Sequence, residues 1–122
     1  MRDFDMSVSE FSGRTVVSLT GELDLDTCPG VARAIDGLTL HGRTLTLDLS
    51  DVSFMDSSSL NMLLRLRRRV EAEGGVLELR GLQEQARRIL EITGTHALFR
   101  LLPGLPTASR SQPPSGVIQE SV

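Results

Sequence analysis

At 122 residues the chain is long enough to fold as one domain, and four Phe with no Trp or Tyr predict an aliphatic core. A net charge of -3 argues against a nucleic-acid partner, because phosphate binding needs a positive surface. Cys28 is the single cysteine, which excludes a disulfide framework and a thiolate zinc site. The N-terminus carries no secretory signal, and no segment is apolar for long enough to cross a bilayer, so we expect a cytoplasmic protein.

The first third of the chain predicts a hairpin followed by a helix. Residues 14–20 form a β-rich run, and residues 6–11 are expected to pair with it. A helix should follow, because Asp26 or Thr27 can cap it and Pro29 suits a first turn. The buried stripe of this helix is predicted at helical spacing, at Val31, Ile35 and Leu38.

The middle of the chain predicts a strand and a long helix. Residues 43–50 alternate, with leucines on one face of the strand. The helix is expected from Ser57 to about Glu73, with Arg67 packing its stem while its guanidinium reaches solvent. The apolar face of this helix is predicted to comprise Leu60, Leu63, Leu64, Leu66 and Val70.

The last third predicts a strand at residues 76–80, a helix that stops before Gly94, and a short strand at residues 97–101. The inward side chains of that helix are expected to be Leu82, Ala86, Ile89 and Leu90. A domain of residues 1–102 should therefore precede a Pro- and Ser-rich tail, residues 103–122, which we expect to be disordered. The element order predicts an α/β fold, with a mixed sheet of four to five strands, a short antiparallel edge and parallel β-α-β crossovers.

Groups for enzymatic chemistry are scarce. The sequence has no lysine, so it cannot form a phosphate-binding P-loop, and it has no Gly-x-Gly-x-x-Gly motif for a dinucleotide. We therefore expect no cofactor. A pair of Cys28 with His41 or His96 is conceivable, but both histidines lie in Gly-containing turns and are interpreted as surface residues. No carboxylates stand at a paired spacing and no metal site is predicted, so the chain is not expected to be an enzyme. Cys28 is interpreted as a structural residue of the helix start with no special reactivity. A redox role stays open, because a helix N-terminus can lower a thiol pKa.

A basic run lies inside the long predicted helix. It comprises Arg65, Arg67, Arg68 and Arg69, followed by Glu71 and Glu73. Because these positions spread around the helix, we interpret them as a solvated face rather than a nucleic-acid patch.

A serine cluster, Asp56-Ser57-Ser58-Ser59, stands where a predicted strand ends and the long helix begins. Asp56 suits the N-cap, and the serines suit the first turn. Capping alone therefore explains these residue types, and a functional role has to be argued from the sequence around them.

That surrounding sequence resembles the STAS-domain anti-sigma factor antagonists of bacteria. The resemblance spans Asp3 to Leu102 and implies the STAS fold, in agreement with the predicted element order. It also implies a partner, an anti-sigma factor that is itself a serine kinase with a histidine-kinase-like ATPase fold, and a metal-dependent serine phosphatase that resets the switch. The segments that carry it are Gly21-Glu22-Leu23-Asp24, the run from Leu47 to Ser58 with its Phe-Met-Asp-Ser-Ser, Ile92-Thr93-Gly94, and Leu98-Phe99.

In that family the unphosphorylated antagonist binds the kinase and frees the sigma factor, and phosphorylation of the second serine of Asp-Ser-Ser dissolves the complex. The resemblance therefore implies that Ser58 is the phosphoacceptor, ahead of Ser57 and Ser59, and that Asp24 and Asp56 are the flanking acidic residues. The predicted partner-binding residues are Asp24, Asp56, Ser57, Ser58, Ser59, Asn61 and Met62.

The chain departs from the family pattern at two places. Ser59 stands where the family usually has Gly, which adds a Cβ and a hydroxyl where a partner is expected to approach, and a third serine for the kinase. From Pro103 onward the sequence lacks the charged helix that antagonists often add. These departures leave open a STAS interaction module outside sigma control, such as a scaffold or a chemoreceptor-like signalling partner. A third hypothesis is a small-molecule-binding module or a weak nucleotide hydrolase. The absence of lysine and of a phosphate-binding loop argues against it.

Overall fold

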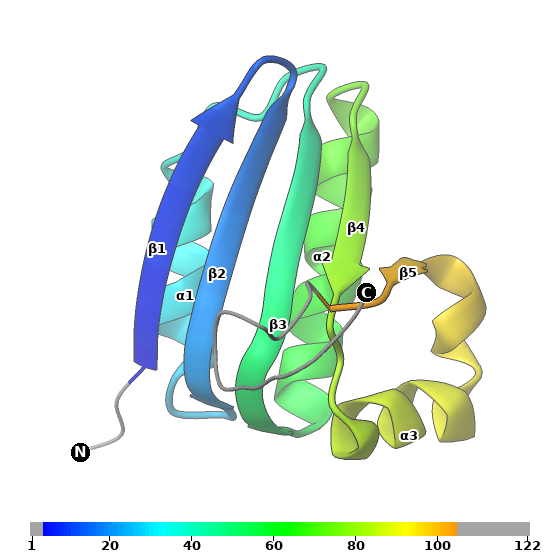
Figure 1. The fold of residues 1–122 in the computed structure, drawn as a ribbon. Coiled ribbons are helices and arrows are strands. Elements are labelled where there is room, and N and C mark those ends of the chain that lie inside the picture. Colours follow the sequence, from blue (N-terminus) through cyan, green and yellow to red (C-terminus); the bar gives the residue numbers. More distant parts are fainter. Residues whose placement is uncertain (1–3, 105–122) are drawn as a thin grey trace, which may run out of the picture.

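The chain forms a five-stranded mixed sheet with helices packed against it (Figure 1). The structure is a computed structural model and describes residues 4–104. The strands are β1 (Phe4–Phe11), β2 (Arg14–Leu23), β3 (Thr44–Met55), β4 (Val76–Arg80) and β5 (Arg100–Leu102); the helices are α1 (Cys28–Asp36), α2 (Ser57–Ala72) and α3 (Glu84–Thr93), with a 3-10 helix η1 (Thr95–Leu98). Strand order follows the chain, with β1 antiparallel to β2 and the remaining neighbours parallel. The predicted fold class is confirmed.

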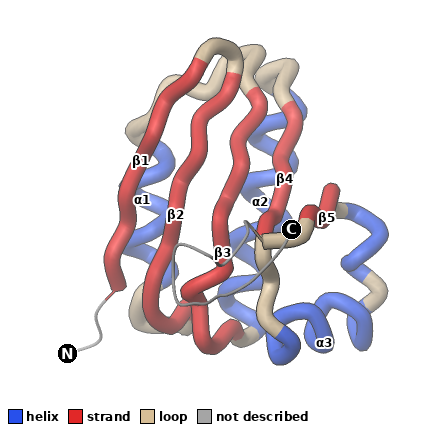
Figure 2. Tube along the Cα trace, viewed as in Figure 1, coloured by secondary structure: helices blue, strands red, loops and turns tan. Residues whose placement is uncertain are grey.

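The helices lie mainly on one side of the sheet. Helices α1 and α2 lie behind it in Figure 1, while α3 and η1 lie beyond its β4–β5 side (Figures 1 and 2). Alternation along β3 turns Leu45, Leu47 and Leu49 into the core and Asp48 to the opposite face. The largest fully buried side chains are Leu, Ile, Val and Met, so the core is aliphatic as predicted.

The apolar face predicted for α2 is confirmed for most of its members. Leu60, Leu63, Leu66 and Val70 are buried, and Leu64 packs half-buried against the core. Met62 is buried as well, although the predicted apolar arc did not include it. It lies on the side of α2 that faces α1, so the neighbouring helix widens the face that α2 buries.

Several strand boundaries differ from the predictions: β1 begins at Phe4, β2 continues to Leu23, and the largest differences are in β3 and β5. The strand predicted to end at Ser50 continues to Met55, because β3 keeps pairing with β2 across register shifts after Ser18 and Gly21. The strand predicted for residues 97–101 begins only at Arg100, because the preceding residues form η1. Periodicity did not reveal either change, since a bulge and a short 3-10 turn both interrupt the alternation of side chains. The tail predicted to be disordered lies, from residue 105 on, outside the described residues.

The sheet topology brings two chain segments to one edge. Strands β2 and β3 are parallel, and Leu23 pairs with Met55 where both strands end. The backbone N–H of Asp56 donates to the Leu23 carbonyl at 3.3 Å. The loop before α1 therefore lies beside the first turn of α2, although the two are separated by more than 30 residues of sequence.

Candidate functional site

The serine cluster forms the first turn of α2. Asp56 is the N-cap, with an extended backbone, and its carboxylate Oδ1 accepts a hydrogen bond from the Ser59 N–H at 3.1 Å. The Asp56 N–H in turn donates to Ser59 Oγ at 3.2 Å, which completes a capping box. The Asp56 cap expected from the sequence is confirmed, and Ser59 is its reciprocal partner.

The three serines lie in different environments. Ser57 is exposed, Ser58 is half-buried, and Ser59 is fully buried. The Ser59 hydroxyl donates a short hydrogen bond to the Leu23 carbonyl, 36 residues earlier in the chain. The expectation that the Ser59 side chain lies where a partner approaches is therefore wrong: its hydroxyl faces inward, and a kinase could not reach it in the folded chain.

The loop between β2 and α1 is held by hydrogen bonds to two carboxylates, one within the loop and one at the start of α2. Asp24 is buried, and its Oδ1 accepts hydrogen bonds from the N–H groups of Asp26 at 3.0 Å and Thr27 at 3.1 Å. Asp56 Oδ2 accepts the N–H of Leu25 at 3.2 Å. Asp24 thus shapes the loop from within, while Leu25 is held on the surface with 71% of its area exposed. Leu25 was not among the predicted site residues, although an apolar residue between two aspartates could have drawn attention to it.

A groove runs between α1 and α2 from the serine cluster. Its first cavity, of about 320 Å³, is lined by Leu25, Cys28, Pro29, Ala32, Ser58, Asn61, Met62 and Arg65. An adjoining cavity, of about 220 Å³, shares Ala32, Met62 and Arg65 and extends to Leu66 and Arg69. We call these two cavities the α1–α2 groove. It brings together three predicted partner-binding residues, Ser58, Asn61 and Met62.

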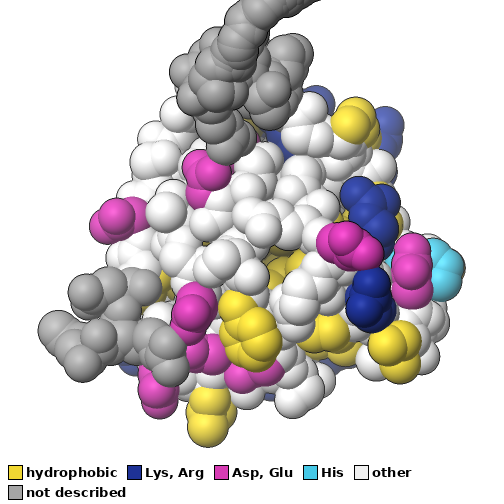
Figure 3. All heavy atoms as spheres, turned by 60° about the horizontal axis from the view of Figure 1, so that its bottom comes forward, with side chains coloured by type: hydrophobic (Ala, Val, Ile, Leu, Met, Phe, Trp, Pro, Cys, Tyr) yellow, Lys and Arg dark blue, Asp and Glu magenta, His cyan; other side chains and the backbone are white. Residues whose placement is uncertain are grey.

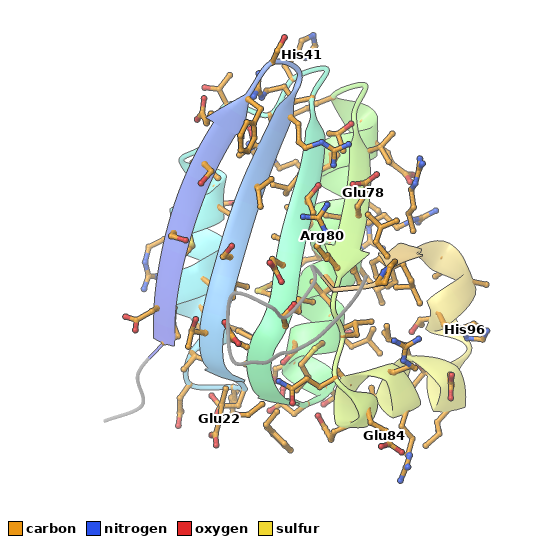
Figure 4. All side chains as sticks on the ribbon, in the orientation of Figure 1. Glu22, His41, Glu78, Arg80, Glu84 and His96 are labelled. Carbon is orange, nitrogen blue, oxygen red and sulfur yellow. The ribbon has the colours of Figure 1, made fainter. Side chains whose placement is uncertain are left out.

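The surface at this end of the molecule is acidic and partly apolar. Figure 3 shows acidic side chains beside exposed hydrophobic ones where the lower ends of the strands come forward. Leu25 and Phe54 are among the exposed hydrophobic residues, and Asp26 and Asp51 are exposed acids of the adjoining loop and strand. Glu22 projects from the same end (Figure 4). The serine cluster is thus bordered by exposed acidic side chains with exposed apolar side chains among them.

Cys28 has the properties of a buried thiol. Burial raises its pKa; the Ser59 hydrogen bond, with Sγ 3.7 Å from Oγ, opposes this, and the negative charges of Asp56 and Asp24 raise the pKa further. The positive charge of Arg65 lowers the pKa without reversing the shift. The thiolate needed for redox chemistry is therefore disfavoured at neutral pH, and the interpretation of Cys28 as a structural residue of the helix start agrees with its surroundings.

The other residues singled out in the sequence stand apart from the serine cluster. His41 lies at the opposite end of the molecule from the start of α2, and His96 lies in η1 beyond the β4–β5 side (Figures 1 and 4). Arg67 pairs with Glu71 at 3.3 Å and Arg69 with Glu73 at 3.2 Å. The solvated face predicted for the basic run is found at Arg65 and Arg68, which are exposed, whereas Arg67 and Arg69 are half-buried and Arg69 also donates to backbone carbonyls at the end of α1. Within residues 4–104, no three His, Cys, Asp or Glu side chains are placed to hold a metal ion. No helix in that range is long and apolar enough to span a membrane.

Comparison with known proteins defines the family. The family model described as "Mlab, STAS domain" matches residues 6–103. The chain belongs to the STAS domain family. An anti-sigma-B factor antagonist of Bacillus subtilis is 30% identical over 92 residues, 75% of this chain and 84% of the relative. An anti-sigma-B factor antagonist of Listeria monocytogenes is 33% identical over 86 residues, 70% of this chain and 75% of the relative.

The fold of a solved STAS protein agrees with this membership. The crystal structure of an anti-sigma factor antagonist from Mycobacterium paratuberculosis superposes with a TM-score of 0.75 at 30% identity, covering 84% of this chain and 88% of that protein. The resemblance read from the sequence is confirmed. These relatives are named as antagonists, which are regulators that bind rather than catalyse, and their names agree with the expectation of a non-enzymatic protein.

Proposed function

We propose that this chain is an anti-sigma factor antagonist whose unphosphorylated form binds an anti-sigma factor and so releases a sigma factor. The partner would be a serine kinase with a histidine-kinase-like ATPase fold, which ends the interaction by phosphorylating Ser58. A metal-dependent serine phosphatase would restore the binding form, and all of these steps would take place in the cytoplasm. The names of the relatives support the antagonist role, and the environment of Ser58 supports the switch.

The observation that carries the proposal is the contrast among the three serines. Ser58 borders the α1–α2 groove and is half-buried, so its hydroxyl is accessible and still lies at the edge of a concave surface. Ser57 is exposed but does not line the groove, and Ser59 is enclosed by Leu23 and Asp56. Of the three hydroxyls, that of Ser58 combines access for a kinase with contact to a bound partner.

A phosphate on Ser58 should leave the fold intact. The kinase would transfer the terminal phosphoryl group of ATP to Ser58 Oγ, with loss of the hydroxyl proton and release of ADP. Ser58 is the second residue of α2, where the helix dipole favours an anion by about 0.3–1 kcal/mol. The Asp56–Ser59 capping box does not use the Ser58 hydroxyl, so its hydrogen bonds can persist after the modification.

The effect of the phosphate should fall on the interface. It adds a charge of about -1.5 to -2 next to Asp56 on an already acidic surface. Like-charge contact and desolvation of charge cost several kcal/mol at an interface. A loss of about 3 kcal/mol already weakens binding more than a hundredfold, at 1.4 kcal/mol for each factor of ten.

The test is to incubate the full chain with candidate anti-sigma kinases and ATP and to map phosphate by mass spectrometry. We expect phosphate on Ser58, its absence in Ser58→Ala, and its persistence in the matched variant Ser57→Ala. In a binding assay with the same kinase and ADP, Ser58→Asp should bind at least about a hundredfold more weakly than wild type. Equal binding of Ser58→Asp would place the switch elsewhere. A stable complex with an unrelated protein, without phosphate transfer, would favour the scaffold alternative.

A further inference from the structure

Arg65 stands two helical turns after Ser58 on the same side of α2. Seven residues at 3.6 per turn bring two side chains to within about 20° of each other around the axis and about 10 Å apart along it. The structure agrees, because Ser58 and Arg65 line the same cavity of the α1–α2 groove. Helical side chains lean toward the N-terminus of their helix, so the long Arg65 side chain extends in the direction of Ser58.

Arg65 differs from its neighbours in the basic run. Arg67 and Arg69 are engaged in ion pairs with glutamates one turn later on α2. Arg65 forms no ion pair with any residue in the described range 4–104 and is exposed to solvent. Its guanidinium is therefore available to an anion without first giving up a carboxylate partner.

The surface of the cavity between Ser58 and Arg65 favours an anion next to Arg65. Among the described residues 4–104, no carboxylate lines the cavity that Ser58 and Arg65 share. Met62 lies between Ser58 and Arg65 and is only 4% exposed, so it forms the apolar base of the cavity. Asn61, exposed on the same wall, carries an amide that can donate a further hydrogen bond. The guanidinium also offers a planar set of donors that matches phosphate oxygens two at a time.

We propose that Arg65 is the internal partner of a phosphate on Ser58. The guanidinium pairs with the phosphate oxygens above Met62, and the pair closes the first cavity of the groove. Phosphorylation then blocks the groove in addition to adding charge, so a partner segment that occupies the cavity in the unphosphorylated form is excluded. The regulatory part of this inference rests on the proposed function, whereas the pairing itself is a property of the isolated chain.

The test is a titration of the phosphate by ³¹P nuclear magnetic resonance. Phosphoserine is incorporated at position 58 of the full chain during translation, so no kinase is needed. The second pKa of a phosphoserine is about 6, and we expect it to lie about 0.3–0.7 unit lower with Arg65 than in Arg65→Gln, in proportion to the strength of an exposed ion pair. Asp56 opposes this shift equally in both proteins. The difference should shrink as salt is raised, because the pair is exposed.

The matched control is Arg68→Gln, which removes the same charge one turn farther along α2. Arg68 is exposed like Arg65 but lines neither cavity of the groove. We expect Arg68→Gln to titrate like wild type, and Arg65→Lys to fall between wild type and Arg65→Gln, because lysine keeps the charge and loses the paired donors. Equal phosphate pKa values in wild type and Arg65→Gln overturn the pairing, and so does an equal shift in Arg68→Gln. If the pairing holds while no kinase modifies Ser58, only the proposed function fails.

Discussion

Two buried polar clusters lie at different places in this fold and serve different purposes. The Glu78 cluster crosses the sheet, on the face opposite α1 and α2. Arg14 Nη1 of β2 contacts Glu78 Oε1 of β4 at 2.6 Å, Thr46 Oγ1 of β3 donates to it at 3.0 Å, and Arg100 Nε of β5 lies 3.4 Å from Oε2 (Figure 4). The Asp56 cluster instead joins the start of α2 to the loop after β2, through Ser59, Leu23 and Leu25.

The difference lies in what each cluster holds in place. Glu78, on β4, is bonded by side chains of three other strands, β2, β3 and β5, so its burial fixes the pairing of these four strands. Asp56 and Ser59 bond mostly to backbone groups, so their burial fixes the path of a loop and the edge of a groove. The first cluster should therefore matter to stability alone. The second should matter to stability and to whatever binds beside Ser58.

Glu78→Gln is expected to give the largest loss of stability in this comparison. The substitution removes the charge that Arg14 and Arg100 share, and hydrogen bonds to charged groups contribute about 1.5–3 kcal/mol. Because the Arg14 side chain is 39% exposed and can be solvated, we expect a loss of about 2 kcal/mol of unfolding free energy in urea titrations. Binding of the anti-sigma partner should be unchanged. Weakened binding by the folded variant would contradict the division between the two clusters.

The same cluster predicts a dependence of stability on pH. Burial opposes ionisation of Glu78, but the hydrogen bonds from Arg14 and Thr46 and the charges of Arg14 and Arg100 outweigh it and lower the pKa. A depressed pKa stabilises the fold above the ordinary glutamate pKa of about 4.3, and this contribution is lost as the pH falls through the lowered value. The melting temperature of the wild type should therefore fall as the pH is lowered from about 5 to about 3, roughly the titration range of carboxyl groups. Glu78→Gln should show a smaller decrease over that range.

Asp56→Ala tests the second cluster and should cost somewhat less stability. Loss of an N-cap carboxylate destabilises by about 0.5–2 kcal/mol, and the Leu25 N–H also loses its acceptor. The substitution also releases the loop that presents Leu25. The loss of binding free energy with the partner should therefore exceed the loss of unfolding free energy. Asp26→Ala is the control, since Asp26 is an exposed acid of the same loop. If the two variants weaken binding equally, charge rather than loop position explains the effect.

Ser59→Ala should have the smallest of the three effects. The Ser59 hydroxyl bonds to Leu23, but the Leu23 carbonyl also accepts the Asp56 N–H, so neither backbone group is left without a partner. We expect a loss of about 1 kcal/mol in chemical unfolding, the usual value of one such hydrogen bond. Ser57→Ala should stay within about 0.5 kcal/mol of wild type, as an exposed substitution does. A Ser59→Ala protein as stable as Ser57→Ala would show that the buried bond contributes nothing.

The sequence predicted the helices better than it predicted the ends of the strands. Amphipathic spacing located α2, and the residue type of Asp56 located its N-cap, because both are local features of the chain. It missed the extension of β3 to Met55, because that segment is ordered by pairing with β2 rather than by its own alternation. It also missed Leu25, whose position depends on a hydrogen bond to Asp56, 31 residues away.

For the candidate site, the residue types in the sequence determined that a capped helix begins at a serine cluster, and the motif pattern determined the family. The tertiary structure decided which serine is accessible. Three adjacent serines are alike in sequence, but a helix turns each by about 100°, and only the neighbours contributed by the end of β2 and by α1 distinguish the directions. Those neighbours enclose Ser59, leave Ser57 in solvent, and place Ser58 at the edge of a groove that Arg65 lines two turns farther along the same helix.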